Sequence, residues 1–350
     1  ATTSLTLSGL IGTETLNTSN TSTFNNKNVG SSKTVTVNSI TLSNGSNGGL
    51  AANYSISAGQ TTTANITAKA LTVSGITASN KTYDSNTTAT LNTGSVSYSG
   101  LVGGDVFNGT YTGAFSDKNV GTGKTVTITP SYTGADVSNY SITNQSSTIA
   151  NITTKALTVS GITTSNKTYD GNTVATLNTS SVLYSGLVAG DTFSGSYTGA
   201  FANANVGTGK TVTISPTYSG ADVSNYNIAN HSTITADISK KALTATASAS
   251  NKVYNGNTTA TTTLTLSGLI GSETLNSSNS STFNNKNVGT NKDITVNTIT
   301  LADGSNGGLA ANYSISAGQT TTANITAKAL TVSGITASNK TYDSNTTATL

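Results

Sequence analysis

The sequence has no cysteine, methionine, tryptophan or arginine, and its only histidine is His231. Without cysteine, a disulfide framework, a thiol nucleophile and an iron–sulfur cluster are excluded. One histidine makes a zinc site nearly impossible, and it allows a serine–histidine–aspartate triad at most once in 350 residues. We therefore expect no enzyme activity, no catalytic residue, no cofactor and no metal.

Charge is scarce as well. Only 8% of the residues are charged, and the formal net charge is +3, whereas soluble domains carry about 25% charged residues. Such a dilute charge does not form the basic stripe that binds nucleic acid. No apolar run approaches the roughly 20 residues of a membrane-spanning helix. The sequence therefore predicts neither a nucleic-acid partner nor a membrane span in this segment.

Uncharged polar residues dominate instead. Threonine, serine and asparagine number 72, 49 and 41, nearly half of the chain. In Lys124–Thr129, apolar Val126 and Ile128 alternate with threonine. A period of two and many β-branched residues are typical of strands. We expect an all-β chain without helices, with hairpin turns at the Asn-Gly pairs that begin at Asn44, Asn47, Asn108, Asn255 and Asn306.

Four short motifs recur in a fixed order about every 86 residues, which indicates tandem repeats. Lys-Ala-Leu-Thr begins at Lys69, Lys155, Lys241 and Lys328. A Tyr-Asp column contains Tyr83 with Asp84, Tyr169 with Asp170, Tyr254, and Tyr342 with Asp343. Asn-Val-Gly ends at Gly30, Gly121, Gly207 and Gly289, and Asn-Tyr ends at Tyr54, Tyr140, Tyr226 and Tyr313. We interpret these columns as a structural repeat motif.

The repeats predict the domain boundaries. These are residues 1–68 (repeat 1, truncated at its start), 69–154 (repeat 2), 155–240 (repeat 3), 241–327 (repeat 4) and 328–350 (the start of a further repeat). Gly45–Leu91 is identical to Gly304–Leu350, and both ends of the chain fall within a repeat. We expect a segment of a longer array. A lone first hairpin is not ordered by itself, so we expect either that residues 328–350 pack on a neighbour or that the segment belongs to a continuous filament.

Each repeat has room for six or seven strands of 5–10 residues, which suits a small antiparallel β-sandwich, immunoglobulin-like or related. A β-solenoid is the alternative, but its rungs repeat every ~20–30 residues and no such sub-period is visible. The junctions between repeats contain no run of proline, glycine or serine that would make a flexible linker. We therefore expect an elongated rod, with ~35–40 Å per domain and ~150 Å for four.

The core of repeat 2 is predicted from its large apolar residues. They are Leu71, Val73, Ile76, Tyr83, Leu91, Leu101, Phe107, Tyr111, Phe115, Val126, Ile128, Tyr140, Ile142 and Ile149. A domain of this size buries little more than about 60% of its surface. Contacts between neighbouring repeats should therefore add to the stability of each one.

Repeat 3 carries the most complete set of motifs. Lys155–Leu177 reads KALTVSGITTSNKTYDGNTVATL, followed by SGLVAGDTFSGSYTGAFANANVGTGKTVTI and SGADVSNYNI. Over its whole length the chain resembles the YDG/MBG-type repeats of large bacterial surface proteins, including filamentous-haemagglutinin-like adhesins. Some copies depart from the pattern at Ser85, Ser344, Asn255, Glu14 and Glu273. The resemblance implies an exported stalk or adhesin region at the bacterial cell surface, without enzyme activity.

Several motifs also allow a binding role. Tyr83 and Asp84 could hold a sugar by stacking and hydrogen bonding, but we favour a core tyrosine followed by a turn. Gly121–Thr125 resembles a phosphate loop but lacks its spacing, so we interpret it as a hairpin turn. Calcium could bind near a junction through acidic residues that are not clustered in sequence, which disfavours it; these are Asp105, Asp117, Asp136, Asp191 and Asp222.

Two minor alternatives concern single residues. His231 has no counterpart in the other repeats, so we expect it at the surface. An intramolecular Lys–Asn cross-link is conceivable because lysine recurs at Lys69, Lys155, Lys241 and Lys328. Such a bond needs a buried acid beside it and sheds ammonia, so intact mass tests it.

The leading hypothesis for function is structural: a stiff stalk or fibre that extends an adhesin from the cell or builds a biofilm matrix. The alternative is a repeated module that binds host or matrix glycans weakly but many times over. The expected partners are neighbouring repeats of the same chain, and other chains if they associate laterally or end to end. Low charge removes the repulsion that opposes lateral association.

Overall fold

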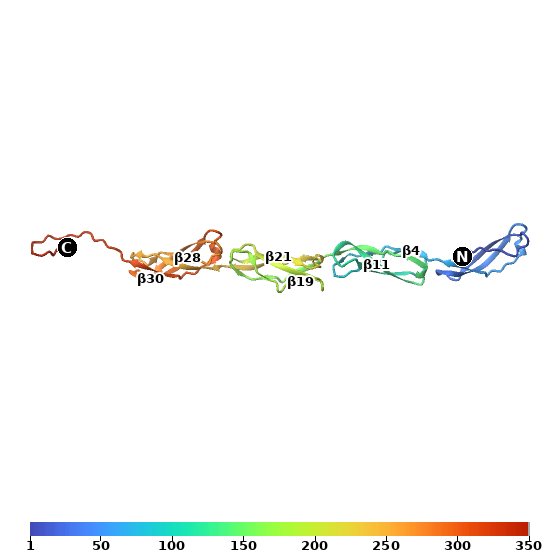
Figure 1. Cartoon of the computed structure of the whole chain (residues 1–350), viewed down its shortest axis with the longest axis horizontal. Coiled ribbons are helices and arrows are strands. Elements are labelled where there is room, and N and C mark those ends of the chain that lie inside the picture. The colour runs from blue at the N-terminus through green and yellow to red at the C-terminus, as the bar shows by residue number, and fades with distance from the viewer. Residues whose placement is uncertain (349–350) are drawn as a thin grey trace. The chain divides into compact units, whose positions relative to one another are not determined.

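The computed structural model describes residues 1–348 of the chain. Its elements are β-strands and short 3-10 turns, and the described residues contain no α-helix (Figure 1). The prediction of an all-β chain of tandem domains is confirmed. Each sheet takes its strands from one repeat, whereas strands of successive solenoid rungs would pair along the chain. The solenoid alternative is therefore wrong.

The contacts divide the chain into two compact units. The first comprises Ala1–Leu157, Gly186–Phe193 and Gly220–Ile228, and the second comprises Thr158–Ser185, Ser194–Ser219 and the chain from Ala229 onward. The division passes through repeat 3. Two loops of repeat 3 therefore belong with repeat 2, which indicates close contact between those loops and repeat 2.

Repeat 2 shows the architecture completely. Its elements are β4 (Lys69–Ser74), β5 (Thr77–Ala78), β6 (Lys81–Thr82), β7 (Thr88–Ala89), β8 (Leu91–Asn92), β9 (Ser97–Ser99), β10 (Asn108–Phe115), β11 (Gly121–Thr133), η2 (Val137–Asn139), β12 (Tyr140–Thr143) and β13 (Ser147–Thr153). A five-stranded sheet has the order β6-β13-β11-β10-β7, and a three-stranded sheet has the order β12-β4-β9. Several strands are only two residues long, shorter than expected.

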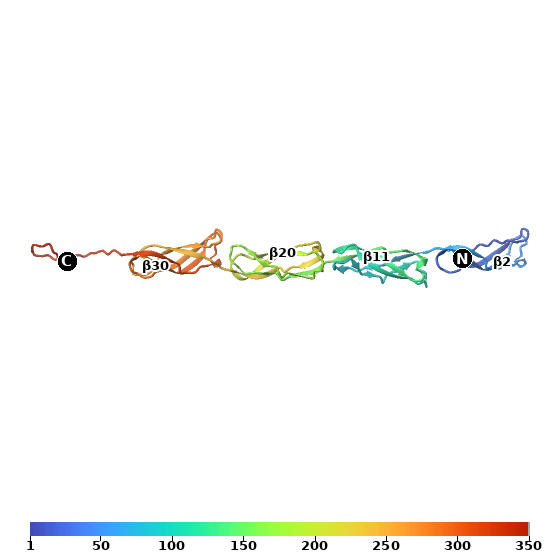
Figure 2. The ribbon, with the colours of Figure 1, turned by 60° about the horizontal axis from the view of Figure 1, so that its bottom comes forward.

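The long antiparallel hairpin β10–β11 forms the centre of this repeat. Its register places Asn108 opposite Thr133 and Phe115 opposite Val126. Along β11, Val126 and Ile128 are buried while the threonines beside them are exposed. Asn108 thus begins a strand, so the turn predicted there is wrong. The equivalent long strands of repeats 3 and 4 are labelled in Figure 2.

The first segment of the repeat pairs with its last strands in parallel. Tyr140 in β12 lies opposite Lys69 in β4, and Ile152 in β13 lies opposite Lys81 in β6. Parallel pairing was not expected from the sequence. Because first and last strands run in the same direction, the chain enters this repeat at one end and leaves it at the other.

Repeats 3 and 4 have the same five-stranded sheet as repeat 2, whereas the sheet of repeat 1 has three strands. Repeat 1 contains β1 (Leu16–Phe24), β2 (Gly30–Asn44), η1 (Ala51–Asn53) and β3 (Thr61–Ile66). Repeat 3 contains β14 (Lys155–Ser160), β15 (Thr163–Thr164), β16 (Lys167–Thr168), β17 (Val174–Ala175), β18 (Leu177–Asn178), β19 (Leu183–Ser185), β20 (Ser194–Phe201), β21 (Gly207–Ser219), η3 (Val223–Asn225), β22 (Tyr226–Ala229) and β23 (Thr233–Ser239). Repeat 4 contains β24 (Lys241–Ala242), β25 (Thr244–Ala249), β26 (Lys252–Val253), β27 (Thr259–Ala260), β28 (Thr262–Ser267), β29 (Leu275–Phe283), β30 (Gly289–Asp303), η4 (Ala310–Asn312), β31 (Tyr313–Ser314) and β32 (Thr320–Thr326).

Most of the predicted core of repeat 2 is buried. The buried residues are Leu71, Val73, Ile76, Tyr83, Phe107, Phe115, Val126, Ile128 and Tyr140, while Leu91, Leu101, Tyr111 and Ile142 are half-buried. Ile149 was predicted wrongly, because its side chain is 67% exposed. Along β13 the inward positions are Ala150 and Ile152. A one-residue error in the phase of the alternation moves a side chain to the opposite face.

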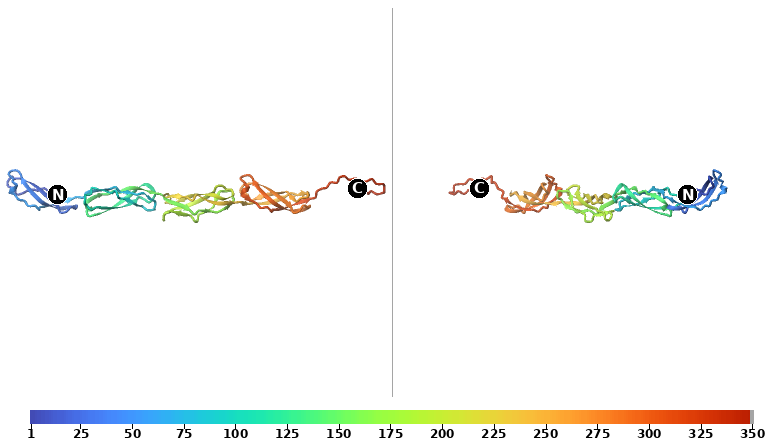
Figure 3. Two further views of the ribbon diagram at one scale, coloured as in Figure 1. Left: turned by 180° about the vertical axis from the view of Figure 1, so that it is seen from behind. Right: turned by 45° about the vertical axis from the view of Figure 1, so that its right-hand side comes forward.

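Residues 328–350 have the sequence of Lys69–Leu91 but not its environment. Leu71 and Tyr83 are fully buried, whereas their equivalents Leu330 and Tyr342 are 89% and 88% exposed. Residues 328–348 form no strand (Figure 3), so the expected packing on a neighbour is wrong for them. Residues 349 and 350 lie outside the described residues.

Candidate functional site at the joints between repeats

Very little chain separates one repeat from the next. Only Thr154 lies between the last strand of repeat 2 and the first strand of repeat 3, and only Lys240 lies between repeats 3 and 4. We call the contacts between successive repeats joints 1, 2 and 3. Joint 1 connects repeats 1 and 2, joint 2 connects repeats 2 and 3, and joint 3 connects repeats 3 and 4. Residues of the Asn-Val-Gly, Asn-Tyr and Tyr-Asp columns meet at these joints.

The Asn-Val-Gly column supplies a loop, which we call the donor loop, to each joint. At joint 2 the Val120 N–H donates to Asn225 Oδ1 at 2.9 Å, and Asn225 Nδ2 donates back to Asn119 Oδ1 at 3.2 Å. The same pair of bonds links Val29 and Asn28 to Asn139, and Val206 and Asn205 to Asn312. The receiving asparagine belongs to the Asn-Tyr column, so two motifs 105 residues apart form one contact.

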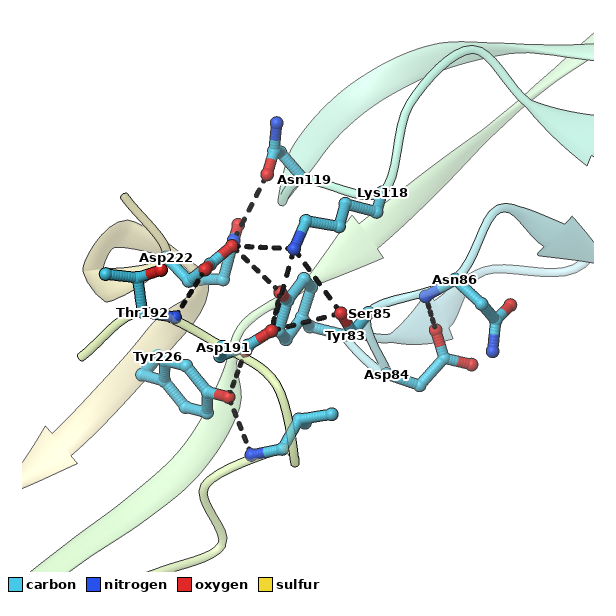
Figure 4. Close-up of polar contacts among 12 residues, drawn as sticks. Tyr83, Asp84, Ser85, Asn86, Lys118, Asn119, Asp191, Thr192, Asp222 and Tyr226 are labelled. Carbon is cyan, nitrogen blue, oxygen red and sulfur yellow. Dashed lines mark hydrogen bonds and ion pairs between the residues drawn. The ribbon is translucent and has the colours of Figure 1, made fainter. Parts of the chain in front are cut away.

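In repeats 2 and 3, the tyrosine of the Tyr-Asp column points into the next repeat. At joint 2 (Figure 4), the buried Tyr83 donates to Asp191 Oδ1 at 3.0 Å and lies 3.3 Å from Asp222 Oδ1. At joint 3, Tyr169 donates to Glu273 Oε1 at 2.6 Å. Tyr83 also meets Tyr226 edge to face, with ring centroids 5.6 Å apart. Such pairs stabilise beyond the area they bury.

One carboxylate in each repeat holds the tyrosine of its own Asn-Tyr pair. Asp105 accepts from Tyr140, Asp191 from Tyr226, Glu273 from Tyr313 and Glu14 from Tyr54. At joints 2 and 3 this carboxylate also accepts the tyrosine of the preceding repeat, so it bridges two hydroxyls. We call the carboxylate together with the Asn-Tyr pair the acceptor face.

The hydroxyls at these joints are held in their protonated, donating form. Burial, followed by the bond to Asp191, raises the pKa of Tyr226 to about 12. Burial, followed by the bond to Glu273, raises the pKa of Tyr169 to about 12. A tyrosine that donates to a carboxylate resists losing its proton, because the two negative charges would then repel.

A lysine completes joints 1 and 2. Lys118 Nζ lies 2.8 Å from Asp222 Oδ1 and 3.6 Å from Asp191 Oδ1. The bond from Lys118, with the Thr192 N–H, holds the pKa of Asp222 below its usual range, and Asp222 raises the pKa of Lys118. At joint 1, Lys27 lies 2.7 Å from Asp136 Oδ1 and 3.0 Å from Asp105 Oδ1.

The acidic residues considered for calcium therefore do converge, but on an ammonium group. Asp105 and Asp136 form one pair at joint 1, and Asp191 and Asp222 form the other at joint 2. Asp117 pairs instead with Lys124 of its own repeat at 2.7 Å. Residues 1–348 contain no group of three or more histidine, aspartate or glutamate side chains arranged to hold a metal.

The acid of the Tyr-Asp column has a local role. Asp84 accepts from Lys81 Nζ at 2.7 Å and from the Asn86 N–H at 3.1 Å, which closes a turn. Asp170 and Asp343 accept the same two contacts from their own repeats. Asn255, which replaces the acid in repeat 4, still accepts the N–H two residues on, at 3.3 Å.

The other motif residues are accounted for by the fold. Gly30, Gly121, Gly207 and Gly289 begin the long strand of each repeat, opposite the isoleucine near the end of the last strand. Tyr254 is half-buried against the core of repeat 4, and Tyr342 is exposed. Gly121–Thr125 begins strand β11, and Gly123 with φ +60° lies at a register shift between Gly121 and Lys124, so the segment is a β-bulge and the hairpin turn predicted there is wrong. His231 is half-buried.

Sequence reasoning did not find the joints themselves. It identified the motif columns, but not that Asn225, Lys118 and the acids of the next repeat meet. One clue was available: lysine precedes Asn-Val-Gly at Lys27, Lys118 and Lys286. No helix within residues 1–348 is long and apolar enough to cross a membrane.

Comparison with known proteins identifies the repeats. The profile of the YDG domain matches residues 1–64, 67–148, 153–236 and 239–323. No curated protein and no solved structure matches the chain. The four matches cover most of the sequence and fall on the four repeats.

Proposed function

Because the chain belongs to the YDG-domain family and carries four copies of that domain in tandem, we propose that it is a structural repeat region of a bacterial surface adhesin or extracellular filament. It acts there as a stiff, extended spacer in adhesion or biofilm. The proposal places the chain outside the cell and assigns it no catalysis. Its resemblance to filamentous-haemagglutinin-like adhesins supports this setting.

One observation carries the proposal: the same contacts lock every pair of successive repeats. At each joint a backbone N–H donates to a buried or half-buried asparagine of the next repeat. One or two residues connect the strands across each joint, so the chain has little freedom to pivot. A region that transmits position over a distance needs joints of this kind.

Small-angle X-ray scattering tests the spacer role. We expect a maximum dimension of the order of 150 Å for four domains. A matched variant with a Gly-Ser insert after Thr154 should lose stiffness at joint 2 alone and show a shorter mean dimension. A compact particle, or an insert that changes nothing, would contradict the proposal.

Weak glycan binding remains the second candidate, and one surface feature favours it. A groove of 710 Å³ in repeat 3 is lined by Tyr197, Leu177, Thr179 and Ser215 among others. Threonine and serine hydroxyls beside an aromatic ring are groups that bind sugars. The motif tyrosines Tyr83 and Tyr169 do not offer stacking faces, because both are buried. Binding of the chain on a glycan array, lost in Tyr197→Ala, would support this candidate.

A further inference from the structure

The joints are of two kinds, and the two sides of each joint differ together. At joints 1 and 2 the residue before Asn-Val-Gly is lysine, and the facing repeat offers two aspartates. At joint 3 that residue is Ala204, and the facing repeat offers one carboxylate, Glu273. The second aspartate is replaced there by Leu309, which stands just before the 3-10 turn as Asp222 does.

We propose that these positions form a pairing rule between repeats. A donor loop with lysine fits an acceptor face with two aspartates, and a donor loop with alanine fits an acceptor face with one glutamate. The rule concerns which faces of the chain recognise each other. It therefore goes beyond the spacer role and holds whether or not the array acts as a spacer.

The aspartate-pair face needs the cation. The side chains of Asp191 and Asp222 are 0% and 8% exposed. Asp222 Oδ2 accepts the Thr192 N–H and Asp191 Oδ2 accepts Tyr226, but hydrogen bonds leave two negative charges close together. Two buried carboxylates without a cation repel and favour protonation. A donor loop with alanine would leave Asp191 and Asp222 without a cation.

The glutamate face has no place for the cation. Both Glu273 oxygens already accept hydroxyls, from Tyr169 and Tyr313, each at 2.6 Å. Ala204 and Ile270 both pack against the apolar cluster that contains Tyr169 and Tyr313. A lysine at this position would lose water contacts without gaining two carboxylate partners, which disfavours the mismatched joint.

Such a rule matters because the repeats are nearly identical. Closely similar tandem domains are prone to pair wrongly during folding, because each exposes a face that resembles its neighbour's partner. Two joint chemistries reduce the number of acceptable pairings. The rule also applies to the two faces that have no partner repeat in this chain. The donor loop of repeat 4 carries Lys286 and therefore suits an aspartate-pair face. The acceptor face of repeat 1 carries Glu14 and Leu50 and therefore suits a donor loop with alanine.

Amide hydrogen exchange of the full chain, followed by NMR, tests the rule. The Val120 and Val206 amides report joints 2 and 3, because each donates across its joint. Lys118→Met keeps the aliphatic stem and removes the charge, and we expect it to lower protection at Val120 about tenfold. Adding Asp222→Asn should restore most of that protection, because the uncompensated charge is then gone. Ala204→Lys should lower protection at Val206.

Two controls distinguish an effect on the joint from a loss of stability within a repeat and from a change in net charge. Ile128 donates within repeat 2 and Ile214 within repeat 3, so their exchange should stay unchanged. Lys240→Met removes the same charge from an exposed side chain and should leave Val120 unaffected. Unchanged protection at Val120 in Lys118→Met, or at Val206 in Ala204→Lys, would overturn the rule. That result would leave the scattering test of the spacer untouched.

Discussion

Tyr83 shows how much of a joint depends on one side chain. Its ring packs against Tyr226 of the next repeat, and its hydroxyl donates to Asp191. The side chain is fully buried, although almost half of the chain consists of small polar residues. Tyrosine suits this position because it buries a large apolar ring and still satisfies a carboxylate with its hydroxyl.

Removing only the hydroxyl should weaken joint 2 modestly. Tyr83→Phe keeps the ring contact but loses the bond to Asp191, at a cost of about 1 kcal/mol. The measurement is the protection of the Val120 amide against exchange. Tyr254→Phe is the matched control, because Tyr254 packs within repeat 4 and should leave all three joints unchanged. Equal effects of the two substitutions would contradict a role for Tyr83 at the joint.

Acid should loosen joints 1 and 2. The bonds from Lys27 and Lys118 hold the pKa values of Asp136 and Asp222 below their usual range. Their stabilisation is therefore complete above the unfolded value of about 3.9, and it is lost as pH falls through the folded pKa. Below about pH 4, the NMR shifts of Val29 and Val120 should follow the titration of these carboxyls. Shifts that stay constant while Asp222 titrates would contradict this.

At the scale of the elements, loop geometry decides which glycines can be replaced. Gly75 adopts φ +85°, and a Cβ there would lie 2.2 Å from the Ser95 carbonyl oxygen. Gly123 adopts φ +60° with open space around it. Repeats 1 and 4 carry Ser32 and Asn291 at the position of Gly123, both with φ 48°. The position of Gly75 therefore needs glycine for space, whereas the position of Gly123 tolerates short polar residues.

This contrast predicts two different outcomes for the same substitution. Gly123→Asn should change the stability of repeat 2 by less than about 1 kcal/mol, because asparagine adopts positive φ at low cost. Gly75→Asn should cost about 2 kcal/mol or more, because the backbone must also move away from Ser95. Exchange at the Ile128 amide measures both. Comparable losses of stability in the two variants would show that the space around the glycine does not determine the cost of the substitution.

Strand formation also depends on partners supplied by the tertiary structure. Residues 262–267 form β28 by pairing with β25. Residues 3–8 have nearly the same sequence but form no strand in the structure. The edges of the five-stranded sheet in repeat 2 are β6 and β7, each only two residues long. Short edges discourage pairing with other chains, so lateral association through edges would need other contacts.

At the scale of the whole molecule, the topology of repeats 2 and 4 suits tension along the chain. In repeat 2 the first segment pairs in parallel with the last strands, at β4–β12 and β6–β13. Repeat 4 shows the same arrangement at β24–β31 and β26–β32. A pull on the two ends of a repeat therefore loads these hydrogen bonds together in shear, instead of opening them one by one.

Single-molecule pulling should reveal this resistance. Unfolding one repeat should lengthen the chain by about 250 Å, since ~86 residues extend to roughly 300 Å. As a control, attachment through Asn108→Cys and Thr133→Cys pulls on residues that lie opposite each other in β10–β11 and should unzip that hairpin at a lower force. Equal forces in the two directions would contradict the shear geometry.

The sequence by itself determined the β-structure, the presence of tandem repeats and most of the core of repeat 2. These follow from local features: period-two alternation, β-branched residues and recurring motifs. The wrong predictions concerned positions whose structure depends on pairing with another strand. Ile149 depended on the phase of β13, and the turn expected at Asn108 gave way to pairing with β11.

Only the tertiary structure decided what the motifs do. At joint 2, the contacting residues of repeat 2 lie far in the sequence from those of repeat 3, and no local pattern relates the two groups. The first group is Tyr83, Lys118 and Val120, and the second is Asp191, Asp222 and Asn225. The parallel pairing of β4 with β12 places the first strand of repeat 2 beside one of its last strands, and Lys118 of the donor loop lies 2.8 Å from Asp222 of the following repeat. Leu71 and Tyr83 are buried whereas their equivalents Leu330 and Tyr342 are exposed, because burial requires strands that only the folded repeat provides.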